Sequence, residues 1–158
     1  MTCGLVMAAQ AEADYSVARA LFEEYAATLG IDLCFQGFSS ELNQLQSMYG
    51  PPGGSLLLAR SGGDFVGCVA VRRWSADSCE MKRLYVRDTA RGAGIGRALA
   101  VAAISNASSM GYRRMLLDTL LDMVTARRMY GALGFRECEP YRHNPIPGTR
   151  FMELLLQA

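Results

Sequence analysis

The sequence predicts an α/β domain, of the α+β or mixed-sheet kind, built around one β-sheet. Its 158 residues suit a single domain, residues 1–158, that buries its own core. Two short apolar runs around a glycine turn predict an early β-hairpin, and helical and strand-like segments alternate after it. Hairpins early and crossovers late are typical of a mixed sheet flanked by helices.

The segment before the hairpin is helical in pattern. Residues 13–29 carry apolar side chains at helical spacing, namely Val17, Leu21, Tyr25 and Leu29. Gly30 is a natural stop for this helix. A second, shorter helix is expected over residues 39–48, before a sharp turn at residues 51–54.

The hairpin pairs residues 55–59 with residues 65–71 through a turn at Gly62 and Gly63. Residues 80–87 are expected to form the third strand of this region.

The second half alternates helix and strand. An alanine-rich helix is expected to end at Gly111, and a later helix at Gly134. A loop broken by prolines at residues 144–148 precedes the last strand. The expected elements are a helix at 94–110, a strand at 115–120, a helix at 124–133 and a strand at 151–156.

The composition is that of an ordinary globular protein, with 51% hydrophobic residues, 20% charged residues and a formal net charge of +1. This balance provides no general field that would attract nucleic acid or an anionic membrane, so we expect neither as a partner. Any anion-binding site must therefore be local.

The five cysteines are scattered, odd in number and never in a C-x-x-C pair, which argues against a disulfide framework and against a metal site. Residues 1–10 lack the basic start of a signal peptide and contain only a short apolar stretch. We therefore expect a cytoplasmic protein.

A glycine-rich segment between a strand and a helix is the most informative feature. Such a turn lets backbone N–H groups point at an anion, and the helix N-terminus adds a favourable partial charge. The alternative is a helix that starts with glycine only for packing. The segment consists of Arg91, Gly92, Ala93, Gly94, Ile95, Gly96 and Arg97.

Two common phosphate loops do not fit this segment. A dinucleotide-binding fingerprint would need glycine in place of Arg97, and a Walker loop would need Gly-Lys-Ser/Thr after the glycines. Several basic side chains lie near the loop in sequence, and they suit a ligand with several phosphates. These are Lys82, Arg83, Arg87, Arg91 and Arg97.

Two motifs resemble those of the GNAT acetyltransferases. The pattern R-x-x-G-x-G at residues 91–96, just after the strand at 81–86, resembles their coenzyme A pyrophosphate loop. Residues 126–135 are similar to their A-x-x-x-Y-x-x-x-G-F helix. The resemblance covers the chain well from about residue 55 onward and the first fifty residues only weakly.

The resemblance implies the GNAT acyl-CoA N-acyltransferase fold, a mostly antiparallel central sheet with about four helices, and acetyl-CoA as co-substrate without a metal. It implies that Leu84, Tyr85 and Val86 bind the pantetheine arm and that the glycine loop binds the pyrophosphate. Tyr130 would face the thioester sulfur, and Glu80 falls where some members place a general base. Met123 departs from the family, which often has Asn at that position.

The chemistry gives both catalytic candidates a reason of their own. An amine must lose a proton before it attacks a thioester, so Glu80 could act as the base; the alternative is a surface strand glutamate paired with Lys82 or Arg83. A tyrosine O–H can donate to the departing thiolate, so Tyr130 could be the acid; the alternative is a core tyrosine.

Three further groups bear on the reaction. A backbone N–H left unpaired by a bulge or splay near residues 84–86 would stabilise the developing oxyanion. Cys68 and Cys79 are expected to be buried structural thiols. His143, the single histidine, could be an alternative base, although a solvated loop position fits it better.

The acceptor side is expected in residues 35–41 and 141–148. Candidate contacts are Phe38, Glu41, His143 and Asn144, with the aromatic face and Glu41 holding a cationic amine. The same residues could instead be a lid that packs on the core.

The sequence thus favours acetyl transfer from acetyl-CoA to a primary amine of a small molecule or protein, by direct attack in a ternary complex. Two alternatives stay open: a non-catalytic acetyl-CoA-binding regulatory module, and an unrelated domain whose glycine loop binds another phosphate ligand. A homodimer is plausible.

Overall fold

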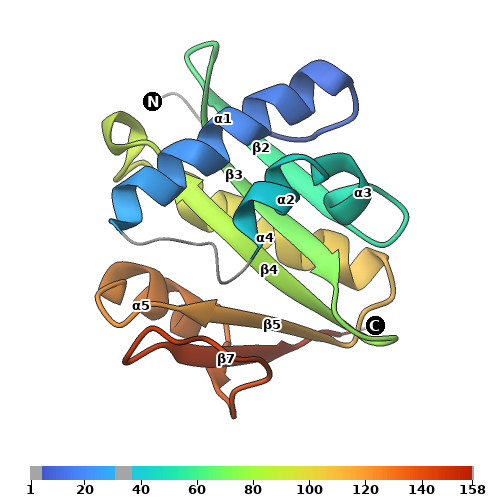
Figure 1. Ribbon diagram of the computed structural model, residues 1–158, viewed down its shortest axis with the longest axis vertical. Helices are drawn as coiled ribbons and strands as arrows, with labels where there is room; N and C mark the ends of the chain where they lie inside the picture. Colours follow the sequence, from blue (N-terminus) through green and yellow to red (C-terminus); the bar gives the residue numbers. More distant parts are fainter. Residues whose placement is uncertain (1–4, 31–36, 158) are drawn as a thin grey trace.

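The computed structural model describes residues 5–30 and 37–157. They form a seven-stranded sheet with the order β1-β2-β3-β4-β5-β7-β6, crossed diagonally by α1 in Figure 1. Within this described part, β4 and β5 are the one parallel pair of neighbours. The strands are β1 (Leu5–Ala8), β2 (Ser55–Ser61), β3 (Asp64–Arg73), β4 (Ser78–Val86), β5 (Arg114–Thr119), β6 (Arg136–Glu137) and β7 (Arg150–Leu155).

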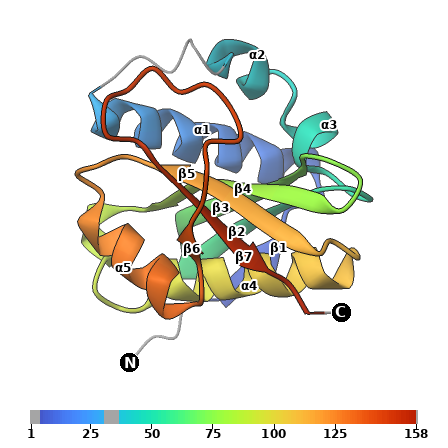
Figure 2. The ribbon, with the colours of Figure 1, turned by 90° about the horizontal axis from the view of Figure 1, so that it is seen from below.

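Helices cover both faces of the sheet (Figure 2). The helices α1 (Glu12–Leu29), α2 (Phe38–Leu42) and α3 (Leu45–Tyr49) lie on one face. The helices α4 (Ile95–Ser109) and α5 (Val124–Ala132) lie on the other. The predicted mixed α/β fold with a mostly antiparallel sheet is confirmed.

Strand alternation divides the core into two layers. In β2, Leu56 and Leu58 belong to the cluster under α1, whereas Leu57 and Ala59 belong to the cluster under α4. All four side chains are almost fully buried, as expected for strands covered on both faces. Gly67 of β3 allows close packing of α4, because a Cβ there would lie 3.1 Å from Leu99 Cδ1.

The sheet opens between β4 and β5. Their parallel pairing ends at Glu80 and Leu116, although β4 continues to Val86 and β5 to Thr119. A bulge accompanies the opening: Cys68 pairs with Tyr85 and Ala70 with Lys82, so two residues of β4 oppose one of β3. Arg83, in the bulge, has a φ of 59°.

The predicted hairpin and the strands and helices after it are present within one or two residues at most ends. The single helix predicted over residues 39–48 is wrong, because α2 and α3 are separated at Asn43 and Gln44. The edge strands β1 and β6 were not expected, since four and two residues are too short to show a period. No helix in the described ranges has the length and apolar character needed to cross a membrane.

Candidate active site

A groove lies where β4 runs into the start of α4, and we call it the glycine groove. Gly92 and Gly94 both adopt the left-handed conformation, with φ values of 86° and 82°, and a Cβ on either would meet open space. The groove is lined by nine of the ten residues that the family resemblance implies for the cofactor: Leu84, Tyr85, Val86, Arg91, Gly92, Gly94, Ile95, Gly96 and Arg97. Ala93 is exposed but does not line it.

The basic residues predicted to crowd this loop do not gather there. Arg91 and Arg97 line the glycine groove, whereas Arg87 forms a bidentate pair with Glu24 of α1, with its shorter N–O distance at 2.6 Å. Lys82 and Arg83, at and next to the bulge, are buried and do not line the glycine groove. Successive strand residues point to opposite faces, so closeness in sequence does not bring these side chains together.

A second hollow occupies the opening between β4 and β5, and we call it the splay pocket. Its lining combines the C-terminal part of α1 and residues of α5 with charged side chains from both strands, including Lys82, Arg83 and Asp118. The splay pocket and the glycine groove are continuous, because they share the lining residues Tyr25, Leu29, Leu84, Met123 and Ala126.

Tyr130 lines the splay pocket from α5. Only 7% of its surface is exposed, and its ring lies 5.6 Å from that of Phe135. Burial raises the pKa of its hydroxyl, and the charge of Asp118 adds to this effect. The hydroxyl makes no hydrogen bond to any described residue. The hydroxyl of this pocket-lining residue therefore keeps its proton at neutral pH.

Glu80 lies at the closed end of the opening and is fully buried. Arg72 Nε donates to Oε1 at 3.1 Å, and the Tyr141 hydroxyl donates to Oε2 at 2.6 Å. Arg142 Nε lies 3.4 Å from Oε2. The expectation of a surface glutamate paired with Lys82 or Arg83 is wrong, since both oxygens are held by other partners. Glu80 also lines neither the glycine groove nor the splay pocket.

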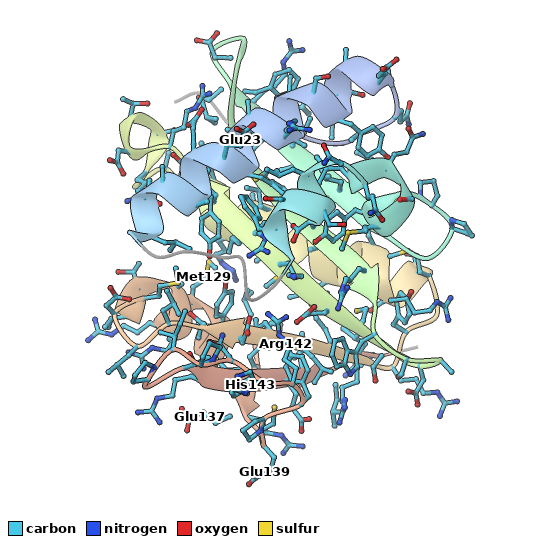
Figure 3. The ribbon with its side chains drawn as sticks, viewed as in Figure 1. Glu23, Met129, Glu137, Glu139, Arg142 and His143 are labelled. Carbon is cyan, nitrogen blue, oxygen red and sulfur yellow. The ribbon has the colours of Figure 1, made fainter. Side chains whose placement is uncertain are left out.

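Of the predicted acceptor residues, Asn144 lines the splay pocket, where its Nδ2 donates to Asp118 Oδ2 at 3.1 Å. His143 is exposed; in Figure 3 it lies over β7, whereas its neighbour Arg142 lies over β5. Phe38 stacks under Arg83, with the guanidinium carbon 5.2 Å from the ring centroid. Residues 35 and 36 of the expected acceptor segment lie outside the described residues.

Glu41 cannot receive a cationic acceptor in the way the sequence indicated, because Arg83 already occupies it. Arg83 donates to both carboxylate oxygens, at 2.7 and 3.0 Å, and Tyr49 donates at 3.0 Å. Burial alone would raise the pKa of Glu41, but these bonds and the charges of Arg83 and Lys82 bring it below its usual value. Glu41 is thus a buried anion that anchors the bulge, and it does not line the splay pocket.

Sequence reasoning missed three residues of the splay pocket: Tyr25, Lys82 and Asp118. Tyr25 was assigned to the core stripe of the first helix and Lys82 to the phosphate loop. All three carry a polar group that lines the opening between β4 and β5, and only the tertiary structure shows this opening. Burial raises the pKa of Tyr25 to about 12.

The remaining candidates agree with structural roles. Cys68 and Cys79 are free, buried thiols, and burial raises the pKa of Cys79 to about 12, so neither is an activated nucleophile. Met123 lies at the junction of the two hollows, with its sulfur 3.5 Å from Thr119 Oγ1. Over the described ranges, no group of three or more His, Cys, Asp or Glu side chains is placed to hold a metal ion.

Comparisons with known proteins agree with the motifs. Residues 17–135 match the model of the acetyltransferase (GNAT) family. An uncharacterised N-acetyltransferase of Schizosaccharomyces pombe is 44% identical over 136 residues, which cover 85% of this chain and 83% of that one. The IAA acetyltransferase of Azospirillum brasilense is 35% identical over 135 residues, with 84% and 86% covered.

Solved structures share the fold. A GNAT acetyltransferase from Staphylococcus aureus superposes with a TM-score of 0.79 at 19% identity, over 98% of this chain and 100% of that one. YncA of Salmonella typhimurium, whose structure contains acetyl-CoA, gives a TM-score of 0.69 at 19% identity, with 98% and 94% covered. The family model and the close relatives together show that this chain belongs to the GNAT acetyltransferase family.

Proposed function

We propose that this protein transfers the acetyl group of acetyl-CoA to a primary amine, by direct attack in a ternary complex. The observation that carries the proposal is the continuity of the glycine groove with the splay pocket, which places the phosphate-binding loop and Tyr130 along one path. Relatives named as acetyltransferases support the same chemistry.

The glycine groove fits the coenzyme A part of the co-substrate. Gly92 and Gly94 leave open space beside the start of α4, where backbone N–H groups and the helix dipole favour a pyrophosphate. The side of β4 that faces the opening has no strand partner beyond Glu80 within residues 5–30 and 37–157, so Leu84 and Val86 can pair with an extended amide-bearing arm. When bound, acetyl-CoA supplies the activated thioester.

In this proposal, the residues of the splay pocket donate a proton and stabilise the developing negative charge. The acceptor nitrogen bonds to the thioester carbon, the carbon–sulfur bond breaks, and Tyr130 donates its proton to the departing thiolate. The backbone at the bulge offers N–H groups to the oxygen that gains negative charge. Because the oxygens of Glu80 are occupied, we assign the amine proton to solvent and not to this carboxylate.

The test measures binding and turnover separately. Calorimetry with acetyl-CoA at submillimolar concentration should show binding, and thiol release over a panel of primary amines should show steady turnover. The panel should include amino acids, because N-acetylaspartate synthetases are similar over 62% of this chain, and peptides, to represent a protein acceptor. Binding without turnover on any amine would favour a regulatory module, and absence of binding would overturn both.

A further inference from the structure

The chain has a single lysine, Lys82, among its 16 basic residues, and this lysine lines the splay pocket. Its side chain is 5% exposed. The nearest carboxylate oxygen, Glu41 Oε1, is 3.9 Å from its Nζ, beyond hydrogen-bonding distance, and no described residue accepts a hydrogen bond from it. A buried ammonium with open donor capacity therefore faces the cavity in which the acceptor must sit.

The charges around Lys82 do not balance. Three buried or half-buried carboxylates, Glu41, Glu80 and Asp118, are shared among four cations. Arg83 occupies Glu41, Arg142 bridges Glu80 and Asp118, and Arg72 takes the remaining oxygen of Glu80. The cluster carries one excess positive charge, and Lys82 is the cation that lacks a hydrogen-bonded anion.

Taking acetyl transfer to a primary amine as the function, we propose that the acceptor is a free amino acid, whose carboxylate binds Lys82 while its amine points toward Leu84 and Tyr130. All three residues line the splay pocket, and Lys82 precedes Leu84 by two positions on β4. A carboxylate would supply the missing anion, and the short spacing suits a small molecule with both groups close together.

A single carboxylate fits the excess charge better than a phosphate. The amine must be neutral when it attacks, so a reactive amino acid carries one negative charge, equal to the excess on the cluster. A phosphomonoester carries about −1.5 to −2 at neutral pH and would leave negative charge uncompensated in a buried site. An uncharged amine would leave Lys82 without a partner.

The first experiment compares acceptors that differ only in the carboxylate. We would measure kcat/KM by thiol release for each amino acid and its carboxamide, corrected for the free amine, with phosphoethanolamine as the phosphate arm. The wild type should prefer the carboxylate by roughly tenfold to a hundredfold. Lys82→Met should abolish this preference, and Lys82→Arg should restore part of it.

The control variant is Arg60→Met, which removes an exposed cation outside both hollows and should leave the preference unchanged. Equal rates for acids and amides in the wild type, or a preference that survives Lys82→Met, would overturn the assignment of Lys82. Faster reaction with phosphoethanolamine would overturn the choice of carboxylate. Thiol release from any amine would still support acetyl transfer itself.

The second experiment needs neither turnover nor a variant. Because Lys82 is the single lysine, labelling with ¹³Cε-lysine gives one side-chain NMR signal. A bound carboxylate should raise the pKa of this ammonium and shift its signal, whereas the carboxamide should not. An unchanged signal at saturating amino acid, in the presence of coenzyme A, would contradict the proposal whatever the enzyme's activity.

Discussion

The role proposed for Tyr130 depends on a single atom, its hydroxyl oxygen. The ring packs against Phe135 and the raised pKa keeps the proton in place at neutral pH. A hydroxyl with no partner among the described residues would be costly in a closed core, but here it borders the splay pocket. Packing and proton donation are thus separable at this residue.

Replacing Tyr130 with Phe should therefore lower turnover without weakening co-substrate binding. The packing surface stays, but the donor to the leaving thiolate is lost, so we expect kcat to fall roughly tenfold to a thousandfold. Thiol release at saturating acetyl-CoA measures the first effect and calorimetry the second. Turnover equal to that of the wild type would make Tyr130 a structural residue.

Lys82 also couples the splay pocket to stability. Burial lowers the pKa of this ammonium to about 8, and the charge of Arg83 acts in the same direction. Groups that face it from the surrounding elements include both signs: Glu41, Glu80, Arg83, Asp118, Arg142 and the hydroxyls of Tyr25 and Tyr130. The unfolded chain keeps this proton up to a pKa near 10.5, whereas the folded chain releases it near 8.

The sign of this linkage is that stability rises with pH, because the unfolded state binds more protons between pH 8 and 10.5. From pH 7 to pH 9.5, the free energy of unfolding of the wild type should gain about 2 kcal/mol relative to Lys82→Met. Urea unfolding of both proteins at the two pH values measures this difference. Parallel pH dependence would show that Lys82 titrates normally.

At the scale of elements, the strand-to-helix turn before α4 is built by glycines that accept positive φ. Gly94 is the N-cap of α4 and has open space where a side chain would begin. A Cβ at Gly96 would lie 3.7 Å from Val86, which is an ordinary contact, so packing does not require glycine at residue 96. The space beside Gly94 is what the pyrophosphate would use.

Gly94→Glu should abolish binding of acetyl-CoA, by at least about a hundredfold in Kd, because it fills this space and adds a negative charge. Gly63→Glu is the matched control: it lies in the β2–β3 turn, with a φ of 91° and open space, so it carries the same backbone strain. Calorimetry on both folded variants separates strain from occupancy. Retained affinity in Gly94→Glu would place the phosphates elsewhere.

At the scale of the whole molecule, Glu80 joins four elements. It receives Arg72 from β3 and, from the segment between β6 and β7, Tyr141 and Arg142; Arg142 in turn reaches Asp118 of β5. Burial and the neighbouring Glu80 raise the pKa of the Tyr141 hydroxyl, which keeps it a donor. This buried network holds the late segment against the open end of the sheet.

Glu80→Gln should therefore destabilise the fold, by about 3 kcal/mol, since two guanidinium groups lose the charge that compensates them. Urea unfolding measures this loss of stability. The control is Glu137→Gln, which removes an exposed ion pair with Arg150 and should change the free energy of unfolding little. Because the proposal assigns the amine proton to solvent, the rise of the turnover rate with pH should be the same in Glu80→Gln as in the wild type. A variant of normal stability whose rate no longer rose with pH would establish Glu80 as the base.

Much of the fold could be predicted because its signals are local. Helical spacing, the Gly62 and Gly63 turn and the glycine loop each act over a few residues, and each predicted the element that is present. The residues of the groove lining were implied by the family resemblance, and nine of those ten line the glycine groove. The family followed from two such motifs and is confirmed.

The charge partners could not be predicted, because they depend on packing between distant segments. Glu41 meets Arg83 across 42 residues and Glu80 meets Tyr141 across 61. The local sequence around a strand carboxylate does not show whether water or a guanidinium group surrounds the side chain. Burial alone makes partners obligatory, because an unpaired charge in a core is too costly to keep. The sequence by itself determined the hairpin, the longer helices and strands, and the glycine loop, because their signals are local. Tertiary packing decided which charged side chains pair with each other, and that Lys82 faces the splay pocket without a hydrogen-bonded anion among the described residues.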